Sequence, residues 1–300
     1  VLITGAGGSI GSELVRQVSD FGPSHLTLLD SSEFNLYAID METSMRHSDI
    51  NRLAIIADVR DTDAITRCLK ETAPELVFHA AALKHVPLVE GNPFEGALTN
   101  IVGTANVADA CVAAKVDAMV MISTDKAVNP TSIMGATKRI AERYGQALDL
   151  GDAASTRFIT VRFGNVLGST GSVVPLFQKQ LADGGPLTVT DPDMKRYFMT
   201  VREAVELILQ SSALGAGESG DGKIFVLDMG DPVFILDLAR QMIRLAGLVP
   251  DEDVKIEFTG LRPGEKLFEE IFHSGEPLVE TGRPGILLAA PRTAGTDEMT

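Results

Sequence analysis

The segment Thr4–Gly11, TGAGGSIG, constrains the fold of this chain more than any other stretch. It follows a short apolar run, Val1–Thr4, that is expected to be a β-strand, and it leads into Ser9–Asp20, which is expected to be a helix. Glycines in such a turn let the backbone approach a pyrophosphate, which the N-terminus of the helix attracts. The strand, turn and helix therefore predict a dinucleotide-binding unit. The expected cofactor contacts in this turn are Gly5, Gly8, Ser9, Ile10 and Gly11.

The first half of the chain repeats this alternation of strand and helix. Short apolar runs predict five further strands, and amphipathic stretches predict helices between them. The expected strands are His25–Asp30, Leu53–Asp58, Leu76–Ala80, Ala118–Ser123 and Arg157–Phe163, and the expected helices are Glu33–Met45, Ala97–Ala114 and Ile133–Leu148. Repeated units of this kind predict an α/β fold, a doubly wound parallel sheet of the Rossmann type.

Asp30 ends the second expected strand, about 20 residues beyond the glycine-rich turn. A carboxylate at this position accepts hydrogen bonds from ribose hydroxyls and repels a 2′-phosphate. Because Ser31 and Ser32 follow without an adjacent arginine, the sequence favours NAD over NADP. Asp58 and Val59, just after the third strand, are expected at the edge of the adenine, although an aspartate here could instead cap a turn.

The rhythm changes after about Gly164, where loops rich in Gly, Pro and Asp surround expected helices at Arg202–Leu214 and Ile235–Ala246. This change predicts a second, smaller lobe that closes over the sheet. We expect an NAD-binding domain over residues 1–168, with 196–216 packing back on it. A smaller α/β substrate-binding lobe is expected from 169–195 and 217–290, followed by a tail at 291–300.

Composition excludes some partners. The net charge of -15 argues against nucleic acid, because a phosphate backbone requires a basic face. The five histidines are scattered, so no metal site is expected. No apolar run approaches the ~18 residues of a membrane span and no signal peptide is present, so we expect a cytoplasmic location and no membrane contact within these residues. The chain begins at Val1 without Met, inside an expected strand, and is therefore expected to be part of a longer protein.

Seven motifs together resemble a known superfamily. They are TGAGGSIG, ADVRD, HAAALKHVPLVE, STDKAVNP, the pair Met134 and Lys138, RFGNVLGS and RPGEK. From Val1 to Phe272 the chain resembles the extended short-chain dehydrogenases/reductases. Within them it is most similar to the UDP-N-acetylglucosamine 4,6-dehydratases of bacterial polysaccharide and glycan biosynthesis. The long branch of that group also has Met at the position of the usual tyrosine and carries a membrane-spanning region upstream. The resemblance therefore implies a full-length protein anchored in the bacterial inner membrane.

The resemblance also implies a reaction. A hydride leaves C4 of UDP-N-acetylglucosamine for NAD, a base removes the C5 proton, an acid protonates the C6 hydroxyl so that water departs, and the hydride returns to C6. By resemblance, Asp125 is the acid at C6 and Lys126 is the base at C5. Thr124 is expected to hydrogen-bond the C4 hydroxyl, whose proton Asp125 would accept directly or through water. The alternative for Asp125 and Lys126 is a solvated ion pair on a surface loop.

Met134 stands where the superfamily carries a tyrosine, four positions before Lys138. A thioether cannot transfer a proton, so Met134 is expected to pack beside the sugar or the nicotinamide ring. Lys138 shares its helix face, and the resemblance implies that this lysine binds the nicotinamide ribose. The small residues Ala80, Ala81 and Ala82 are expected where the chain passes close to the cofactor.

Further residues are expected to contact the nucleotide sugar. They are Lys84, Val86, Glu90, Asn165, Arg196, Arg262 and Glu265. The planar guanidinium of an arginine suits a diphosphate, and Arg262 lies in the RPGEK motif. Glu265 is expected to hold the uridine ribose, with a salt bridge to Lys266 or Arg262 as the equal alternative.

Two other functions compete with the dehydratase. A UDP-sugar epimerase has the same fold, but a C4 epimerase normally needs the tyrosine and has no use for Asp125 beside Lys126. A non-catalytic dinucleotide-binding module would explain Met134, but it would not need Asp125, Lys126 or Arg262. A homo-oligomer, dimeric or higher, is expected for either enzyme.

Overall fold

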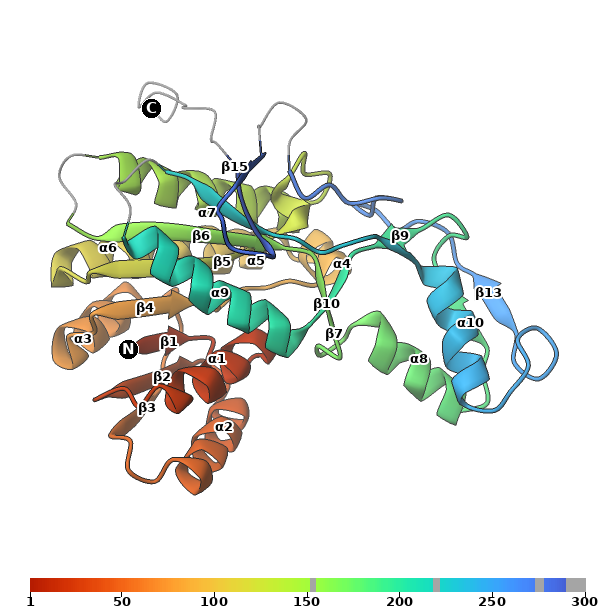
Figure 1. Cartoon of the computed structure of the whole chain (residues 1–300), viewed down its shortest axis with the longest axis horizontal. Coiled ribbons are helices and arrows are strands. Elements are labelled where there is room, and N and C mark those ends of the chain that lie inside the picture. The colour runs from red at the N-terminus through yellow and green to blue at the C-terminus, as the bar shows by residue number, and fades with distance from the viewer. Residues whose placement is uncertain (152–154, 218–221, 273–277, 290–300) are drawn as a thin grey trace.

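The computed structural model describes residues 1–151, 155–217, 222–272 and 278–289, and its centre is one nine-stranded sheet (Figure 1). The strand order is β14-β15-β11-β6-β5-β4-β1-β2-β3. The strands are β1 (Leu2–Thr4), β2 (Leu26–Asp30), β3 (Arg52–Ile56), β4 (Leu76–His79), β5 (Ala118–Thr124), β6 (Arg157–Phe163), β11 (Ile224–Leu227), β14 (Leu278–Glu280) and β15 (Ile286–Ala289). All pairs from β3 to β11 are parallel, which confirms the predicted Rossmann-type sheet.

The order of the strands reverses at β1, because the chain runs outward from β1 to β3 and then crosses back to β4. Ligands of open α/β sheets bind outside the carboxyl ends of the strands at such a reversal. The turns after β1 and β4 therefore lie where a ligand of such a sheet is expected.

Helices cover both faces of this sheet (Figure 1). They are α1 (Ser9–Asp20), α2 (Glu33–Arg46), α3 (Thr62–Thr72), α4 (Val86–Gly91), α5 (Pro93–Ala97), the π-helical turn η1 (Leu98–Val102), α6 (Gly103–Ala114), α7 (Ile133–Leu150) and α9 (Val201–Ala216). Successive strand residues point to opposite faces, so Ile3 joins a core with α1 and α9, whereas Leu2 joins a second core with α3 and α6. Each face is thus sealed by its own apolar layer.

Helix α3 was not predicted from the sequence, although its signals are present. Asp61 caps it by accepting a hydrogen bond from the backbone N–H of Ala64 at 3.0 Å. Ile65, Cys68 and Leu69 have the spacing of one helix face, and all three are buried.

The smaller lobe has a separate core beyond the carboxyl end of the sheet. The lobe contains α8 (Val173–Ala182), β8 (Leu187–Val189), α10 (Ile235–Leu245) and β13 (Ile256–Phe258). Two short strand pairs accompany them: β7 (Asn165–Leu167) pairs with β10 (Phe198–Thr200), and β9 (Lys195–Arg196) pairs with β12 (Val233–Phe234). Phe177, Leu187 and Ile243 are fully buried in this core.

The structure differs from the predicted division of the chain at one point. Strands β11, β14 and β15 fall within 217–290, the range assigned to the smaller lobe, but they extend the large sheet. Their short apolar runs do not encode a partner strand, and β11 joins the sheet because β6 presents an open edge to it. Helix α9 packs against α1 and β6, on the large sheet.

Among the described residues, one helical stretch, Pro93–Ala114, is long and apolar enough by length and composition to cross a membrane. It is the continuous run of α5, η1 and α6. Its last part, α6, packs against α3, α7, β4 and β5, which is the packing of a sheet-covering helix.

Candidate active site

The catalytic candidates lie at the carboxyl end of β5. The strand ends at Thr124, and Asp125–Ala127 form a single 3-10 turn, η2. The Lys126 ammonium donates to Asp125 Oδ1 and to Asn165 Oδ1, both at 3.0 Å, and the Thr124 hydroxyl donates to Asp125 Oδ1 at 2.8 Å. Asp125 is 0% exposed and the Lys126 side chain is 19% exposed. The two residues therefore form a largely buried pair, not a solvated ion pair on a loop.

One oxygen of this aspartate is left without a partner. Asp125 Oδ2 is buried and accepts no hydrogen bond from the described part of the chain. It lies beside Gly164, where a Cβ would come within 3.2 Å of it. A buried acceptor without a protein partner is costly in a folded protein, so Oδ2 is available to an ordered water or a ligand.

Helix α7 carries Met134 and Lys138 on its buried face. The Ser132 hydroxyl caps the helix by accepting from the N–H of Gly135 at 3.0 Å. The Lys138 ammonium donates to the carbonyl of Ile122 on β5 at 2.6 Å. Burial lowers the pKa of Lys138 to about 8, although the charge of Glu142 opposes that effect. The two residues share one side of the helix, and their roles toward sugar and cofactor stay predictions.

A buried ion pair holds α7 against the sheet behind these residues. Arg162 on β6 donates to Glu142 on α7 at 2.9 and 2.8 Å, and Ser123 on β5 donates to Glu142 at 2.6 Å. Burial alone would raise the pKa of Glu142, but Arg162 and Ser123 outweigh it, so the pKa is lowered. The charged carboxylate of Glu142 thus links α7 to β5 and β6 and fixes the position of Lys138 relative to the sheet.

The residues expected to bind the cofactor surround a groove of about 320 Å³, within the range of ligand pockets. Those that line it are Gly5, Gly8, Asp30, Asp58, Val59, Ala80, Ala81 and Ala82. Gly5 has a φ of 66°, and a Cβ there would lie 2.6 Å from the N of Ala81. A Cβ on Gly11 would lie 1.9 Å from the carbonyl oxygen of Gly5. The absence of side chains at Gly5 and Gly11 therefore keeps this turn compact. Small residues form part of the groove wall beside polar ones such as Asp30, and this combination suits a dinucleotide.

Asp30 is held toward the glycine-rich turn. Its carboxylate accepts from the N–H of Gly7 at 2.9 Å and from that of Ser32 at 2.8 Å. A carboxylate has about four acceptor positions, so two remain for ribose hydroxyls.

Ser9 contacts the loop after β7, since its hydroxyl accepts from the N–H of Thr170 at 3.3 Å. Ile10 packs against the core under the sheet.

Arg60 also lines the groove and was not predicted. Its guanidinium donates to Asp58 Oδ2 at 2.8 and 2.6 Å and to Glu95 at 2.6 Å. Hydrogen bonding from Arg60 lowers the pKa of Asp58. The signal available in the sequence was an arginine two residues after an aspartate that ends a strand.

The loop after β4 is held by Asn100. This side chain in η1 accepts from the N–H of Leu83 at 2.8 Å and donates to the Leu83 carbonyl at 2.9 Å and to Thr137 at 3.0 Å. Its π-helical turn is of the kind found at functional sites.

His79 is a structural residue, because both ring nitrogens bond threonine hydroxyls and burial lowers its pKa to about 3.

The three residues that were expected to face the sugar, Lys84, Val86 and Glu90, lie in different surroundings, and their contact with the sugar stays a prediction. Lys84 is exposed as a residue, but partial burial of its ammonium lowers its pKa. The charge of Lys126 lowers this pKa further. Val86 begins α4. Glu90 accepts from the N–H of Ile133 at 2.6 Å, so its carboxylate caps the N-terminus of α7.

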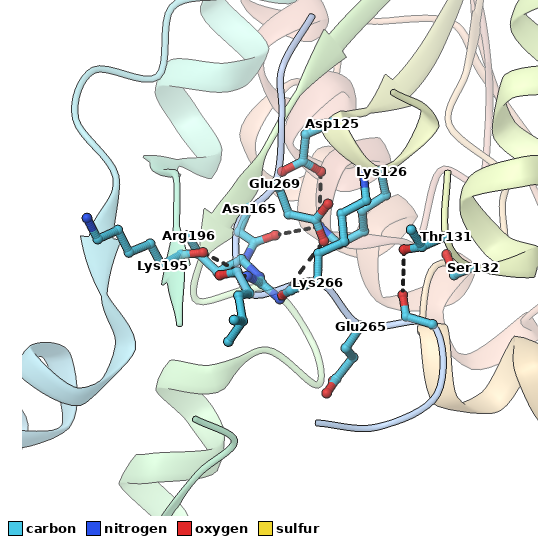
Figure 2. A network of polar contacts seen from close by, with 12 residues as sticks. Asp125, Lys126, Thr131, Ser132, Asn165, Lys195, Arg196, Glu265, Lys266 and Glu269 are labelled. Carbon is cyan, nitrogen blue, oxygen red and sulfur yellow. Dashed lines mark hydrogen bonds and ion pairs between the residues drawn. The ribbon is translucent and has the colours of Figure 1, made fainter. Parts of the chain in front are cut away.

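The RPGEK segment, residues 262–266, lies against the loop between η2 and α7, residues 128–132 (Figure 2). Thr131 donates to the carbonyl of Gly264 at 3.2 Å, and the Lys266 ammonium donates to the carbonyl of Val128 at 3.0 Å. The carboxylate of Glu265 accepts from the backbone N–H of Arg262 at 3.1 Å, while the side chain of Arg262 is exposed. Two segments more than a hundred residues apart thus meet above β5.

Arg196 braces this segment. It is 8% exposed, and its guanidinium donates to the backbone carbonyls of Lys195 at 2.7 Å, Lys266 at 2.8 Å and Leu267 at 3.1 Å. The sequence suggested a phosphate ligand, but the donors face the chain itself. Its contact with the nucleotide sugar stays a prediction.

Glu269 is the main residue of the site that the sequence did not single out. It is 4% exposed, and its Oε1 lies 3.9 Å from Arg196. Burial raises its pKa, and the charge of Asp125 adds to that effect, whereas Lys126, Arg196 and Lys266 oppose it. Because the residue lies in an irregular loop, no periodicity marked it.

Comparison with known proteins agrees with this geometry. The family model described as polysaccharide biosynthesis protein matches residues 1–291. The capsular polysaccharide biosynthesis protein CapD of Staphylococcus aureus is 53% identical over 277 residues, which are 92% of this chain and 45% of that protein. The chain thus spans about half the length of this relative. The protein Pen of Bacillus thuringiensis has a solved structure that is 36% identical, with a TM-score of 0.87 over 98% of this chain and 87% of that one.

Shorter relatives have two different activities. The inverting UDP-N-acetylglucosamine 4,6-dehydratase of Campylobacter jejuni is 34% identical over 282 residues, 92% of this chain and 78% of that protein. The UDP-glucose 4-epimerase of Rickettsia bellii is 36% identical over 284 residues, with the same two coverages. The chain therefore belongs to the polysaccharide biosynthesis protein family, a group of nucleotide-sugar dehydratases and epimerases with the extended short-chain dehydrogenase/reductase fold.

Proposed function

We propose that this chain is a 4,6-dehydratase that converts UDP-N-acetylglucosamine to a UDP-4-keto-6-deoxy sugar and uses NAD. The observation that carries this proposal is the buried pair of Asp125 and Lys126 at the end of β5, with Thr124 bonded to the same carboxylate. A dehydration needs an acid and a base at neighbouring carbons, and this pair supplies both within one turn of chain.

The proton steps use side chains of this site alone. Thr124 hydrogen-bonds the C4 hydroxyl, and Asp125 accepts its proton. Lys126 removes the proton from C5, and Asp125 passes its own proton to the C6 hydroxyl, which departs as water. Lys126 finally returns a proton to C5. NAD, when bound, supplies the hydride acceptor at C4 and the hydride donor at C6, so that it ends the cycle unchanged. Each proton taken up by the enzyme is thus released again within the cycle.

The remaining expected contacts complete the proposal. Lys138 orients the nicotinamide ribose from α7, Arg262 binds the diphosphate from the smaller lobe, and Met134 packs without a chemical role. Asp30 accepts hydrogen bonds from the ribose hydroxyls, and its negative charge supports NAD over NADP. A cytoplasmic location, an upstream membrane anchor and a homo-oligomer stay predictions from the resemblance.

The alternative is epimerisation at C4, because UDP-glucose 4-epimerases are among the relatives. That reaction needs one proton-transfer group at C4, for which the superfamily uses the tyrosine that Met134 replaces. It gives no reason for a buried aspartate and lysine beside the site. A non-catalytic binding module gives no reason for this pair either, because burying charges without a function costs stability.

One experiment separates the three functions. The purified protein is incubated with UDP-N-acetylglucosamine, and the products are followed by mass spectrometry while NADH is monitored by its absorbance. A dehydratase yields a product lighter by one water, with no NADH accumulating in proportion to product. An isomer of unchanged mass would indicate the epimerase, and an unaltered substrate that nevertheless binds would indicate the module.

A further inference from the structure

Glu269 has the features of a group kept for function and not for stability. Its carboxyl is buried, and its Oε2 accepts no hydrogen bond from the described residues. Arg196 lies at 3.9 Å from the other oxygen, but three backbone carbonyls already occupy its guanidinium. Burying a carboxylate without full pairing is costly, so the fold alone does not explain this residue.

The charged groups that face Glu269 come from three segments. They are Asp125 and Lys126 in η2, Arg196 in β9, and Lys266 in its own loop. Figure 2 shows the Glu269 side chain directed into the group formed by Asp125, Lys126 and Asn165. An ammonium has three donors, and Lys126 uses two of them, toward Asp125 and Asn165. The third is available to a further acceptor in this group.

The proposed reaction has a requirement that Asp125 cannot meet. Lys126 must be a free amine when it takes the C5 proton, yet in the structure its ammonium donates to Asp125 and to Asn165. Asp125 cannot take that proton, because it must accept the proton of the C4 hydroxyl. A second acceptor is therefore needed beside Lys126.

We propose that Glu269 is a positioning residue that acts through Lys126 by accepting its ammonium proton before C5 is deprotonated. This inference rests on the function proposed above. The N–H bond of Lys126 breaks and an O–H bond forms on Glu269 Oε2, so a charged pair becomes a neutral amine and a neutral carboxyl. After the hydride has returned to C6, Lys126 protonates C5 and recovers its proton from Glu269. The cycle needs no outside acid or base.

Two effects favour this transfer once a substrate is bound. No hydrogen bond joins Lys126 and Glu269 among the described residues, so the transfer requires the two groups to approach. A sugar that expels water from the site then favours the neutral pair. The raised pKa of Glu269 also brings the carboxyl closer to the amine in proton affinity than an exposed glutamate would be. Both effects act in the direction that frees Lys126.

The test compares Glu269→Gln, which keeps the shape and removes the proton acceptor, with the wild type. The matched control is Glu257→Gln, the same substitution on the exposed surface of β13 in the smaller lobe. For each protein, kcat and KM for UDP-N-acetylglucosamine are measured from about pH 6 to 10, and Tm without substrate is measured at about pH 5 and 8.

We expect the wild type and the Glu257 variant to hold a nearly constant kcat between about pH 7 and 9. Glu269→Gln should lose about tenfold or more in kcat at pH 7, with KM within about twofold. Its kcat should then rise with pH, because Lys126 must now lose its proton to solvent. Glu269→Asp, which keeps an acceptor, should restore part of the activity and the flat profile.

The Tm measurement tests whether Glu269 destabilises the folded protein, and it needs no catalytic turnover. A glutamate whose folded pKa is raised loses stability as the pH rises through that pKa, so removing its charge should raise Tm by about 2 °C or more at pH 8 and by less at pH 5. A lower Tm for Glu269→Gln at pH 8, or a pH profile equal to that of the wild type, would overturn the inference. If the wild type itself is inactive, the proposed function fails, and the Tm shift alone decides whether Glu269 is held at a cost.

Discussion

The groove after β1 and the charged cluster proposed to face the sugar, called the sugar side below (Asp125, Lys126, Arg196, Lys266 and Glu269), are built on different principles. Much of the groove wall is backbone and small residues that follow successive strands. The glycine-rich turn beside it is tightly packed at Gly5 and Gly11, where an added Cβ would meet backbone atoms within 3 Å. The sugar side consists of charged side chains from segments far apart in the sequence, with Asp125 and Glu269 buried there. The first depends on shape and the second on charge.

This difference predicts which substitutions each region tolerates. In the groove, a single extra methyl group should do more harm than the loss of a polar group. On the sugar side, a change of charge at constant shape should do more harm to catalysis than a change of volume. The predictions below test the comparison, beginning with the largest effect.

Asp125→Asn keeps the shape of the side chain and removes the proton acceptor, so kcat should fall at least about 100-fold, within the range of general acid–base catalysis. Lys126→Ala should cause a loss of the same order. Met134→Ala changes volume without removing a proton-transfer group and should cost roughly tenfold or less. The measurement is kcat for each protein, shown to be folded and loaded with NAD. If Met134→Ala were as inactive as Asp125→Asn, the distinction between charge and shape would fail on this side.

Gly11→Ala tests the groove, because its Cβ would lie 1.9 Å from the Gly5 carbonyl oxygen. Overpacking of this kind should lower the free energy of unfolding by about 1–3 kcal/mol and weaken NAD binding. Gly91→Ala is the matched control, since no atom lies within 4 Å of the added methyl group. Urea denaturation and NAD titration check both variants. Equal stability of the two would show that the turn after β1 yields easily, against our view of the groove.

Arg262→Ala removes an exposed charge of the smaller lobe. A charge-assisted contact with phosphate contributes about 1.5–3 kcal/mol, so KM for the nucleotide sugar should rise about tenfold or more, with a smaller change in kcat. Arg244→Ala, at an exposed position of α10, should leave KM unchanged. A change in KM of less than about twofold for Arg262→Ala would remove this segment from the diphosphate site.

Lys138 combines both principles, because it is a charge buried beside the groove. Its folded pKa of about 8 lies below the usual value, so the unfolded chain binds its proton more tightly and the stability of the cofactor-free protein should rise with pH above 8. The gain is at most about 1.4 kcal/mol per pH unit. Urea denaturation at about pH 8 and 9.5 measures it, and Lys138→Met should abolish this part of the rise. An equal rise in both proteins would mean that other groups cause it.

The sequence by itself determined the fold class and the cofactor groove. A strand, a glycine-rich turn and a helix are local signals, and Asp30, Asp58 and Ala80–Ala82 follow the strand ends that such units bring to one edge of the sheet. The position of Asp125 and Lys126 was predictable for the same reason. They follow an apolar run that indicates a buried strand, which the structure shows as β5.

Only the tertiary structure decided how the sugar side is assembled. Arg196 donates to the backbone of a loop about 70 residues away, Glu90 caps α7, and the Glu269 side chain is directed toward Asp125 and Lys126 from an irregular segment. In the neighbouring groove, the entry of Arg60 is decided in the same way. The membership of β11, β14 and β15 in the large sheet is of the same kind. Periodicity reports which face of an element is buried, but not which distant element covers it. Partners of this kind follow from strand order and packing, which a local pattern does not contain.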